Sequence, residues 1–393
     1  MKFIKRLLIS LMVIILLAIT GLYITGNGHI VNGLPSTYLS GNSKPDIDDM
    51  GFHDVRTVQA GEPMPWNESL LAEDALPSED IDYMDDLETT AFLVIKGDEI
   101  IYERYAMGYN ESTLSNSFSM AKSFTSLCIG TACDRGLIRE TEKVSKYLPR
   151  FAQDEQDRRL TVRQVLQMRS NIDFGESYGD PFGYMAKAYF GDDLLELTEP
   201  FHVSGYPGTL WKYEGGNTVI LSEILTKATN KNLSEWFSST VWSQIGAEND
   251  AYWNLDKEDG TEKAFSGFYA TARDFARIGK LMRDRGKWDG RKIVGFGWVE
   301  SSITPVNVAN AEGDVVEHYG YQWWLAPQDN EPWHFSARGM RGQYIIAVPS
   351  EDLVIVRLGH NRVESEANAT MTPDLSRWVE MGLKLKEQHA ERH

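Results

Sequence analysis

The chain has 393 residues, of which 42% are hydrophobic and 11% aromatic, so it can form one large or two ordinary globular domains. Its formal net charge of −18 argues against a nucleic-acid-binding function, because phosphate binding needs clustered Lys and Arg. The two cysteines, Cys128 and Cys133, are too few for a zinc cluster, and their spacing on one helix disfavours a disulfide. We therefore expect no metal and no cofactor.

A basic and then apolar segment begins the chain, with Lys2, Lys5 and Arg6 ahead of an apolar run over residues 7–24. Such a run spans about 27 Å as a helix, close to the hydrocarbon thickness of a bilayer. The basic flank predicts a cytoplasmic N-terminus, so we expect residues 1–26 to be an uncleaved signal anchor crossing a bacterial-type cytoplasmic membrane once. The rest would lie on the periplasmic or extracellular side; a cleaved signal peptide is the alternative.

Residues 27–87 are rich in Gly, Pro, Asn, Ser and Asp, a composition typical of irregular structure. We expect this segment to be a tether followed by an arm that wraps the folded domain, which is expected to span residues 88–393. That domain is predicted to begin with a β-hairpin, because short apolar runs at 92–95 and 100–105 flank a polar turn.

The next helix is predicted to end near Asp134, where Gly136 suits a C-cap. The residues from about 140 to 250 are predicted to form a helical insertion with long loops, because helical periodicity and an N-cap Thr recur there. Strands are expected to return near the C-terminus, before a closing helix with Pro373 in its first turn. The expected helices cover 160–168, 218–228 and 271–283, and the expected strands cover 321–326, 343–348 and 353–358.

Strands at both ends of this domain flank a mostly helical middle. The predicted fold class is therefore α/β (α+β), with an antiparallel sheet that the two chain ends complete and helices on its faces.

The sequence Ser119-Met120-Ala121-Lys122 lies at the expected start of the first domain helix. Residues i and i+3 share one face of a helix, so the Ser119 hydroxyl and the Lys122 amine are expected to meet. A serine hydroxyl needs a neighbouring base to act as a nucleophile, and a lysine can be that base when burial or nearby charge lowers its pKa. This pair therefore points to acyl transfer.

Three more segments accompany this motif: residues 160–170, residues 211–218 with Tyr213 ahead of a helix, and the Gly-rich residues 337–343 ahead of a strand. Together with Ser119-x-x-Lys122, their order and spacing resemble the class C β-lactamase-like serine hydrolases over about residues 88–385. That family includes penicillin-binding proteins, certain esterases and 6-aminohexanoate-dimer hydrolases. The arm sequence at 38–41 and the segment 339–343 resemble the last branch most, and the resemblance implies the β-lactamase/DD-peptidase-like fold.

The resemblance also implies a role for each matching residue. Ser119 matches the acylated nucleophile, Lys122 its base, and Tyr213 the tyrosine that relays a proton between nucleophile and leaving group. The backbone N–H groups of Ser119 and Met340, with Gly339 beside them, match an oxyanion hole, in which each donor stabilises the transition state by a few kcal/mol.

The second motif of this family has an Asn two residues after the tyrosine, where this chain has Gly215, and Asn217 is the candidate substitute. The third motif of β-lactamases has Lys or His, then Thr or Ser, then Gly. Here the matching residues are Ala337 and Arg338, followed by a glycine, so the cation that holds a β-lactam carboxylate is missing at its usual place. Arg338 and Arg341 are candidate replacements, but the pattern favours small ester or amide hydrolysis over β-lactamase activity.

Residues 175–179 match Gly-x-Ser-x-Gly, which offers Ser177 as an alternative nucleophile. That motif needs a buried strand before it and a helix directly after it, and the flanking sequence fits neither, so we interpret it as a loop over the site. Tyr178 and Asp180 in this loop are candidate substrate contacts. His360, after the last strand, is either a pocket residue or a polar residue at a strand end.

The expected function is that of a serine hydrolase acting through an acyl-enzyme on a small ester or linear amide. One alternative is a cell-wall D-amino-acid peptidase or β-lactamase, which penicillin would label at Ser119. The other is a catalytically silent protein that binds peptidoglycan fragments, although the presence of Ser119, Lys122 and Tyr213 together argues against it.

Overall fold

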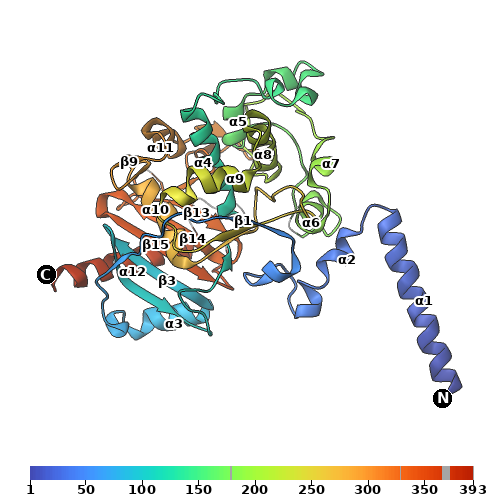
Figure 1. The fold of residues 1–393 in the computed structure, drawn as a ribbon, viewed down its shortest axis with the longest axis horizontal. Coiled ribbons are helices and arrows are strands. Elements are labelled where there is room, and N and C mark those ends of the chain that lie inside the picture. Colours follow the sequence, from blue (N-terminus) through green and yellow to red (C-terminus); the bar gives the residue numbers. More distant parts are fainter. Residues whose placement is uncertain (178, 328, 365–371, 393) are drawn as a thin grey trace.

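The computed structural model describes residues 1–177, 179–327, 329–364 and 372–392 (Figure 1). Its largest sheet has seven strands in the order β12-β13-β14-β15-β3-β4-β2. The expected hairpin lies within it as β3 (Thr89–Lys96) and β4 (Glu99–Tyr105). From the other end of the chain, β15 (Leu353–Gly359) pairs antiparallel with β3, so the two ends of the domain complete one sheet, as predicted.

Two features of this sheet differ from the prediction. β2 (Asn67–Glu68) pairs parallel with β4, so the sheet is antiparallel except at this edge. β12 covers only Trp324–Leu325 instead of 321–326, because Gln322 has a left-handed φ of 64° that an extended strand cannot contain. β13 (Phe335–Gly339) and β14 (Gln343–Val348) complete the sheet.

Successive side chains of a strand point to opposite faces of the sheet, so the apolar interior forms two layers. Leu93 and Ile95 of β3 belong to the layer with α4 (Met120–Asp134) and α10 (Ala272–Arg283). Phe92 and Val94 belong to the opposite layer with α12 (Pro373–Ala390), which begins with the expected proline. The sheet is therefore covered by helices on both faces (Figure 1).

A second sheet of four strands, in the order β1-β6-β7-β5, was not expected from the sequence. Its strands have two to four residues and pair across long stretches of chain, so no local alternation marks them. They are β1 (Val55–Val58), β5 (Ser115–Asn116), β6 (Ala251–Asn254) and β7 (Phe268–Ala270). The sheet matters for the site because β5 leads directly to Ser119.

Short helices dominate the segment from 140 to 250. They are α5 (Val162–Leu166), α6 (Tyr184–Phe190), α7 (Leu194–Thr198), α8 (Gly216–Thr229), α9 (Leu233–Thr240) and the 3-10 turns at Val144–Lys146, Pro149–Ala152, Asp157–Arg159 and Trp242–Gln244. The N-cap Thr expected for the helix at 160–168 is Thr161, which forms a capping box with Gln164. The remaining elements are β8 (Lys287–Trp288), β9 (Arg291–Lys292), α11 (Phe296–Ser302), β10 (Val308–Ala309) and β11 (Val315–Val316).

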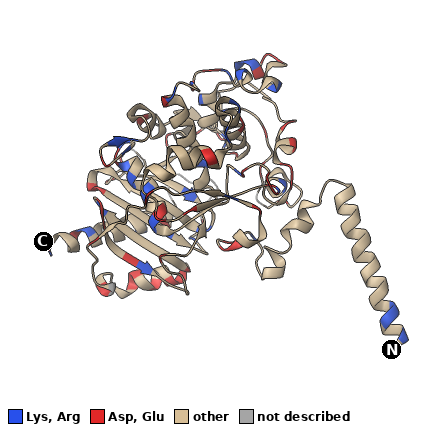
Figure 2. Cartoon of the chain, in the orientation of Figure 1, with Lys and Arg blue, Asp and Glu red and all other residues tan. Residues whose placement is uncertain are grey.

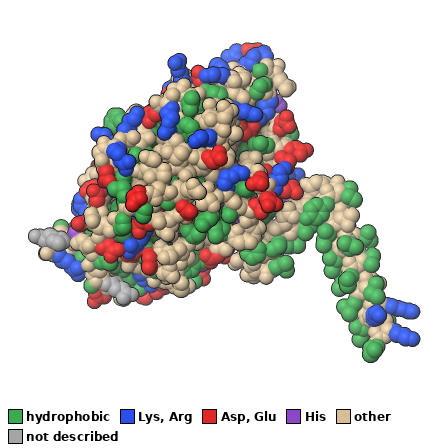
Figure 3. All heavy atoms as spheres, in the orientation of Figure 1, with side chains coloured by type: hydrophobic (Ala, Val, Ile, Leu, Met, Phe, Trp, Pro, Cys, Tyr) green, Lys and Arg blue, Asp and Glu red, His purple; other side chains and the backbone are tan. Residues whose placement is uncertain are grey.

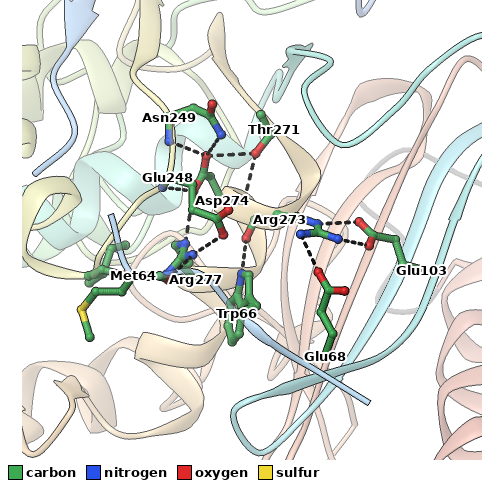
Figure 4. Close-up of polar contacts among 11 residues, drawn as sticks. Met64, Trp66, Glu68, Glu103, Glu248, Asn249, Thr271, Arg273, Asp274 and Arg277 are labelled. Carbon is green, nitrogen blue, oxygen red and sulfur yellow. Dashed lines mark hydrogen bonds and ion pairs between the residues drawn. The ribbon is translucent and has the colours of Figure 1, made fainter. Parts of the chain in front are cut away.

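The segment 27–87 is less irregular than its composition suggested, since it contains a nine-residue helix, α3 (Ser78–Asp86), as well as strands β1 and β2. It also contains α2 (His29–Gly33) and 3-10 turns at Tyr38–Ser40, Asp49–Phe52 and Glu73–Ala75. Figure 4 shows how part of it is fastened to α10. Arg277 donates to the Met64 carbonyl (2.7 Å), Trp66 donates to the Arg273 carbonyl (3.1 Å), and Arg273 pairs with Glu68 (2.9 Å).

The first helix, α1 (Lys2–Ile24), is long and apolar enough to span a membrane and has no buried residue. It stands away from the rest of the molecule in Figure 1, and Figure 3 shows hydrophobic side chains along its length. In Figure 2, Lys and Arg gather at its start, whereas both signs of charge are interspersed over the remainder and acidic side chains gather along α3.

Candidate active site

Ser119 lies where the short strand β5 turns into the buried helix α4. It is the N-cap residue of α4, and Lys122 lies in the first turn. Phe118, just before it, has a left-handed φ of 45°. Such a conformation costs a bulky residue free energy and persists only where the surrounding structure fixes it. The turn that presents Ser119 is therefore held by its neighbours rather than by its own preference.

Lys122 is 1% exposed, and its side-chain nitrogen donates two hydrogen bonds. One goes to Ser119 Oγ at 3.0 Å and the other to the backbone carbonyl of Phe265, also at 3.0 Å. The centroid of the Tyr213 ring lies 5.1 Å from the same Nζ. The spacing of the Ser-x-x-Lys motif thus brings the hydroxyl and the amine together, and the fold adds the tyrosine.

Tyr213 lies in the loop before α8, and backbone bonds hold this loop in place. The Trp211 N–H donates to Ala309 (2.9 Å) and the Lys212 N–H to Met168 (3.0 Å). The Tyr213 ring packs on Trp324, with centroids 5.3 Å apart. Trp324 is thus an aromatic wall behind the tyrosine.

Glu176 is a site residue that the sequence analysis missed. Its Oε1 accepts the Gly216 N–H at 2.8 Å, and a Cβ added to Gly215 would lie 3.3 Å from that oxygen. The other oxygen, Oε2, is buried and has no hydrogen-bond partner within the described residues. The carboxylate of Glu176 therefore lies beside Gly215, where the family motif would have placed an Asn side chain.

The electrostatics of this carboxylate connect it to Lys122. Burial raises the pKa of Glu176, while the positive charge of Lys122 and the N–H groups of Gly215 and Gly216 oppose the rise. Its neighbour Glu214 is also buried, which raises its pKa to about 7 despite an ion pair with Lys212 at 2.7 Å. The start of α8 thus holds two carboxyl groups that bind protons more readily than carboxylates in water.

Asn217 does not take the place of the missing motif Asn. It is buried in the first turn of α8, and its side-chain N–H donates to the Glu214 carbonyl at 3.3 Å. No hydrogen bond joins it to Ser119 or Lys122 in the part of the chain that the structure describes.

The Gly-rich segment approaches Ser119 from the edge of the main sheet. A Cβ added to Gly339 would lie 2.3 Å from the Ser117 carbonyl oxygen, so only a glycine allows this contact. Met340, the next residue, is half-buried. Over residues 1–177, 179–327, 329–364 and 372–392, the N–H groups of Ser119 and Met340 donate no hydrogen bond. Two free donors therefore lie on adjoining segments.

The two arginines of this segment have different surroundings. Arg338 is buried on the face of β13 opposite to Ala337, where its Nε donates to Ser336 (3.0 Å) and its guanidinium lies 5.0 Å from the Trp324 ring centroid. Burial lowers its pKa to about 10. Arg341 points to the arm, with its Nε donating to the Pro45 carbonyl at 2.8 Å.

The other candidates lie away from these contacts or outside the described residues. Asp180 is exposed and accepts the Phe182 N–H at 2.9 Å within its own turn. Ser177 is exposed in a loop without a preceding strand, as expected from its flanks, and Tyr178 lies outside the described residues. His360 directly follows β15, as in the strand-end alternative, and it contacts Asp46 of the arm (2.8 Å) and Tyr109 (3.1 Å). Both cysteines are free, as the sequence indicated.

Comparison with known proteins shows the family of this chain. The family model described as beta-lactamase matches residues 80–379. The chain belongs to the β-lactamase family. This β-lactamase-family protein is 32% identical over 292 residues to the 6-aminohexanoate-dimer hydrolase of Paenarthrobacter ureafaciens, with 69% of this chain and 72% of the relative covered.

Solved structures confirm the fold of this β-lactamase-family protein. A Bacillus anthracis protein assigned as a 6-aminohexanoate-dimer hydrolase aligns with a TM-score of 0.75 and 25% identity, covering 87% of this chain and 93% of that one. A family VIII carboxylesterase aligns with a TM-score of 0.62 and 18% identity, covering 84% of this chain and 100% of the esterase. The resemblance and fold class inferred from the motifs are therefore confirmed, and the protein is a serine hydrolase of the β-lactamase family.

Proposed function

We propose that Ser119 is the nucleophile and that the substrate is a small ester or a linear amide. Ser119 Oγ attacks the substrate carbonyl carbon as its proton passes to Lys122. The leaving amine or alcohol takes a proton through Tyr213, and the C–N or C–O bond breaks to give an ester of Ser119. Water then attacks this acyl-enzyme, which releases the acid and returns the proton to Ser119.

The observation that carries this proposal is the 3.0 Å contact between Ser119 Oγ and the buried Lys122 Nζ, with the Tyr213 ring beside them. A nucleophile, a base within hydrogen-bond reach and a third group near the base make up the constellation expected for covalent catalysis. The free N–H groups of Ser119 and Met340 fit an oxyanion hole for the tetrahedral intermediate.

We assign Glu176 as an electrostatic partner of Lys122. When Lys122 takes the proton of Ser119 it becomes an ammonium in a buried site, and a nearby carboxylate stabilises that charge. Because Gly215 carries no side chain, Glu176 can lie beside it and supply this charge from another loop.

Two observations favour this substrate class. The relative with 32% identity is named for an amide-linked dimer of 6-aminohexanoate, and an aligned structure is a carboxylesterase. At the motif position whose cation would hold a β-lactam carboxylate, this chain has Ala337. Linear amides and esters agree with these observations better than β-lactams do.

We further propose that α1 is a single-pass anchor with the catalytic domain outside the cytoplasm. Its length, its apolar surface and the basic residues at its start support this orientation. Residues 27–87 would be the tether and arm, and residues 88–393 the hydrolase domain.

Hydrolysis of p-nitrophenyl butyrate by the full chain in detergent tests the nucleophile. The Ser119→Ala variant is expected to lose activity by roughly a thousandfold, about 4 kcal/mol of transition-state stabilisation. Ser177→Ala removes the same hydroxyl from the neighbouring loop and should react like the wild type. Activity that survives in Ser119→Ala but not in Ser177→Ala would reverse the assignment, and an inactive wild type would favour the silent binding protein.

A further inference from the structure

The two proposed oxyanion donors, Ser119 and Met340, each adjoin a non-glycine residue with a left-handed backbone. Phe118 precedes Ser119 with a φ of 45°, and Arg341 follows Met340 with a φ of 61°. Both residues depend on external contacts to keep this conformation. The same short piece of the arm, residues 45–49, which we call the strut, supplies contacts to both.

On the nucleophile side, the strut acts through Asn116. Asp49 is buried, and its Oδ1 accepts the Asn116 side-chain N–H at 2.9 Å. The Ile47 carbonyl accepts the Asn116 backbone N–H at 2.9 Å. The amide oxygen of Asn116 in turn accepts the Phe118 N–H at 2.9 Å. Asp49 therefore fixes the orientation in which the Asn116 amide holds the strained Phe118.

Two tyrosines keep Asp49 in this orientation. The Tyr189 hydroxyl donates to its Oδ2 at 2.8 Å, and the Tyr269 hydroxyl donates to its Oδ1. The carboxylate therefore has hydrogen-bond donors on both oxygens, and its partner Asn116 can present only its oxygen to Phe118.

On the other side, the strut holds Arg341. The Arg341 Nε donates to the Pro45 carbonyl at 2.8 Å, and its Nη2 lies 3.8 Å from Asp46 Oδ2. Asp46 also bonds His360 at 2.8 Å, and the His360 carbonyl accepts from Arg341 at 2.9 Å. The arm, the end of β15 and the segment after Met340 thus form one connected group.

We propose that the strut is a positioning element of the active site, in which Asp49 and Asp46 fix the Ser119 and Met340 N–H groups through Asn116 and Arg341. This inference rests on the proposed function, because it takes Ser119 as the nucleophile and the two N–H groups as oxyanion donors. An oxyanion hole acts in the transition state, so loosening the strut lowers kcat and leaves KM nearly unchanged.

The test compares acid-to-amide changes at three positions of the arm in the full chain, with p-nitrophenyl butyrate. Asp49→Asn and Asp46→Asn are each expected to lower kcat by about tenfold with KM within about twofold, because a misplaced oxyanion donor costs rate. Glu68→Gln is the matched control: it removes an arm carboxylate that pairs with Arg273 at the fastening shown in Figure 4, so kcat should stay within about twofold.

A swapped variant separates positioning from general loss of stability. Asp49→Asn/Asn116→Asp reverses donor and acceptor between the two side chains and still offers an oxygen to the Phe118 N–H. It should recover kcat to within about threefold of the wild type, because the bond to Phe118 is restored. If Asp49→Asn fails to fold, Asp46→Asn decides alone at the Met340 side.

The inference is overturned if folded Asp49→Asn and Asp46→Asn keep the wild-type kcat while Ser119→Ala is inactive. A loss that appears in KM instead, or an equal loss in Glu68→Gln, would also overturn it. An active Ser119→Ala variant would overturn the proposed function and the inference together, so the two failures are distinguishable.

Discussion

In the proposed mechanism, Glu176 contributes a negative charge to the site from a loop that is distant in sequence from the Ser-x-x-Lys helix. Burial raises its pKa, and the nearby charge of Lys122 opposes that rise, so its ionised form is the one that interacts with a protonated Lys122. Because its pKa lies above the ordinary carboxyl value, Glu176 takes up its proton at a higher pH than a glutamate in water does. The benefit to catalysis is therefore present above that pKa and is lost below it.

Glu176→Gln is expected to lower kcat/KM at neutral pH by about tenfold, or ~1.4 kcal/mol, because Lys122 loses its carboxylate partner. The variant should also lack the fall in kcat/KM at low pH that protonation of Glu176 causes, since a glutamine does not titrate. Profiles of kcat/KM from about pH 5 to 8 measure both effects. Ser177→Ala, next in the loop, provides the control with an unchanged profile, and an unchanged acid limb in Glu176→Gln would contradict the assignment.

The residues of this site differ in how readily the sequence reveals them. Ser119 and Lys122 could be predicted together because a spacing of three residues on a helix places both side chains on one face. Glu176 could not, because it reaches Gly216 through a loop whose path no periodic pattern specifies. The empty Cβ position of Gly215 was the available signal: a motif position without its side chain indicates that another residue fills the space.

Helices and strands that local sequence specifies were also predicted, whereas elements that depend on distant contacts were missed. The hairpin β3–β4, the helices α4 and α10 and the closing α12 were predicted because apolar period, caps and turn residues agree within each segment. The second sheet was missed because β1 and β6 pair only after the chain has folded. The helix α3 was missed because its many acidic residues hide its weak apolar stripe.

The packing of α10 on the main sheet depends on Gly279, which gives a prediction at the scale of one element. A Cβ at this position would lie 2.4 Å from Val354 and 2.8 Å from Ile345, two branched residues of the strands beneath. Gly279→Ala is therefore expected to lower the free energy of unfolding by about 1–3 kcal/mol through overpacking. Urea unfolding followed by tryptophan fluorescence measures the change.

Gly297→Ala in α11 is the matched control, since no atom lies within 4 Å of a Cβ added there. That change should be neutral or stabilise the protein by up to about 1 kcal/mol, as expected for alanine in an open helical position. Equal unfolding midpoints for the wild type and Gly279→Ala would show that the sheet can move away from the helix.

At the scale of the whole molecule, a helix without any buried residue precedes an arm that contacts the catalytic turn. If α1 is an anchor, the arm is also the connection between the membrane and the site. The chain would then hold its strut in place from three directions: the anchor before it, the tyrosines around Asp49, and the fastening of Met64, Trp66 and Glu68 after it.

The orientation of the anchor is testable by protease treatment of intact bacterial spheroplasts that carry the full chain. Lys2, Lys5 and Arg6 begin α1, and basic residues that flank a membrane span are retained on the cytoplasmic side. Without protease, the domain is expected in the membrane fraction. Protease added outside the spheroplasts is expected to digest it. Replacing these three residues by Gln should lower the accessible fraction, because the orientation signal is lost.

Replacing three basic residues outside α1, Lys44 of the arm and Lys227 and Lys231 of the domain, by Gln changes the net charge equally and should leave the accessible fraction unchanged. A protected domain would place the site in the cytoplasm. A soluble domain that lacks residues 1–26 would show that the segment is a cleaved signal peptide, and the strut would then position the oxyanion donors without any connection to a membrane.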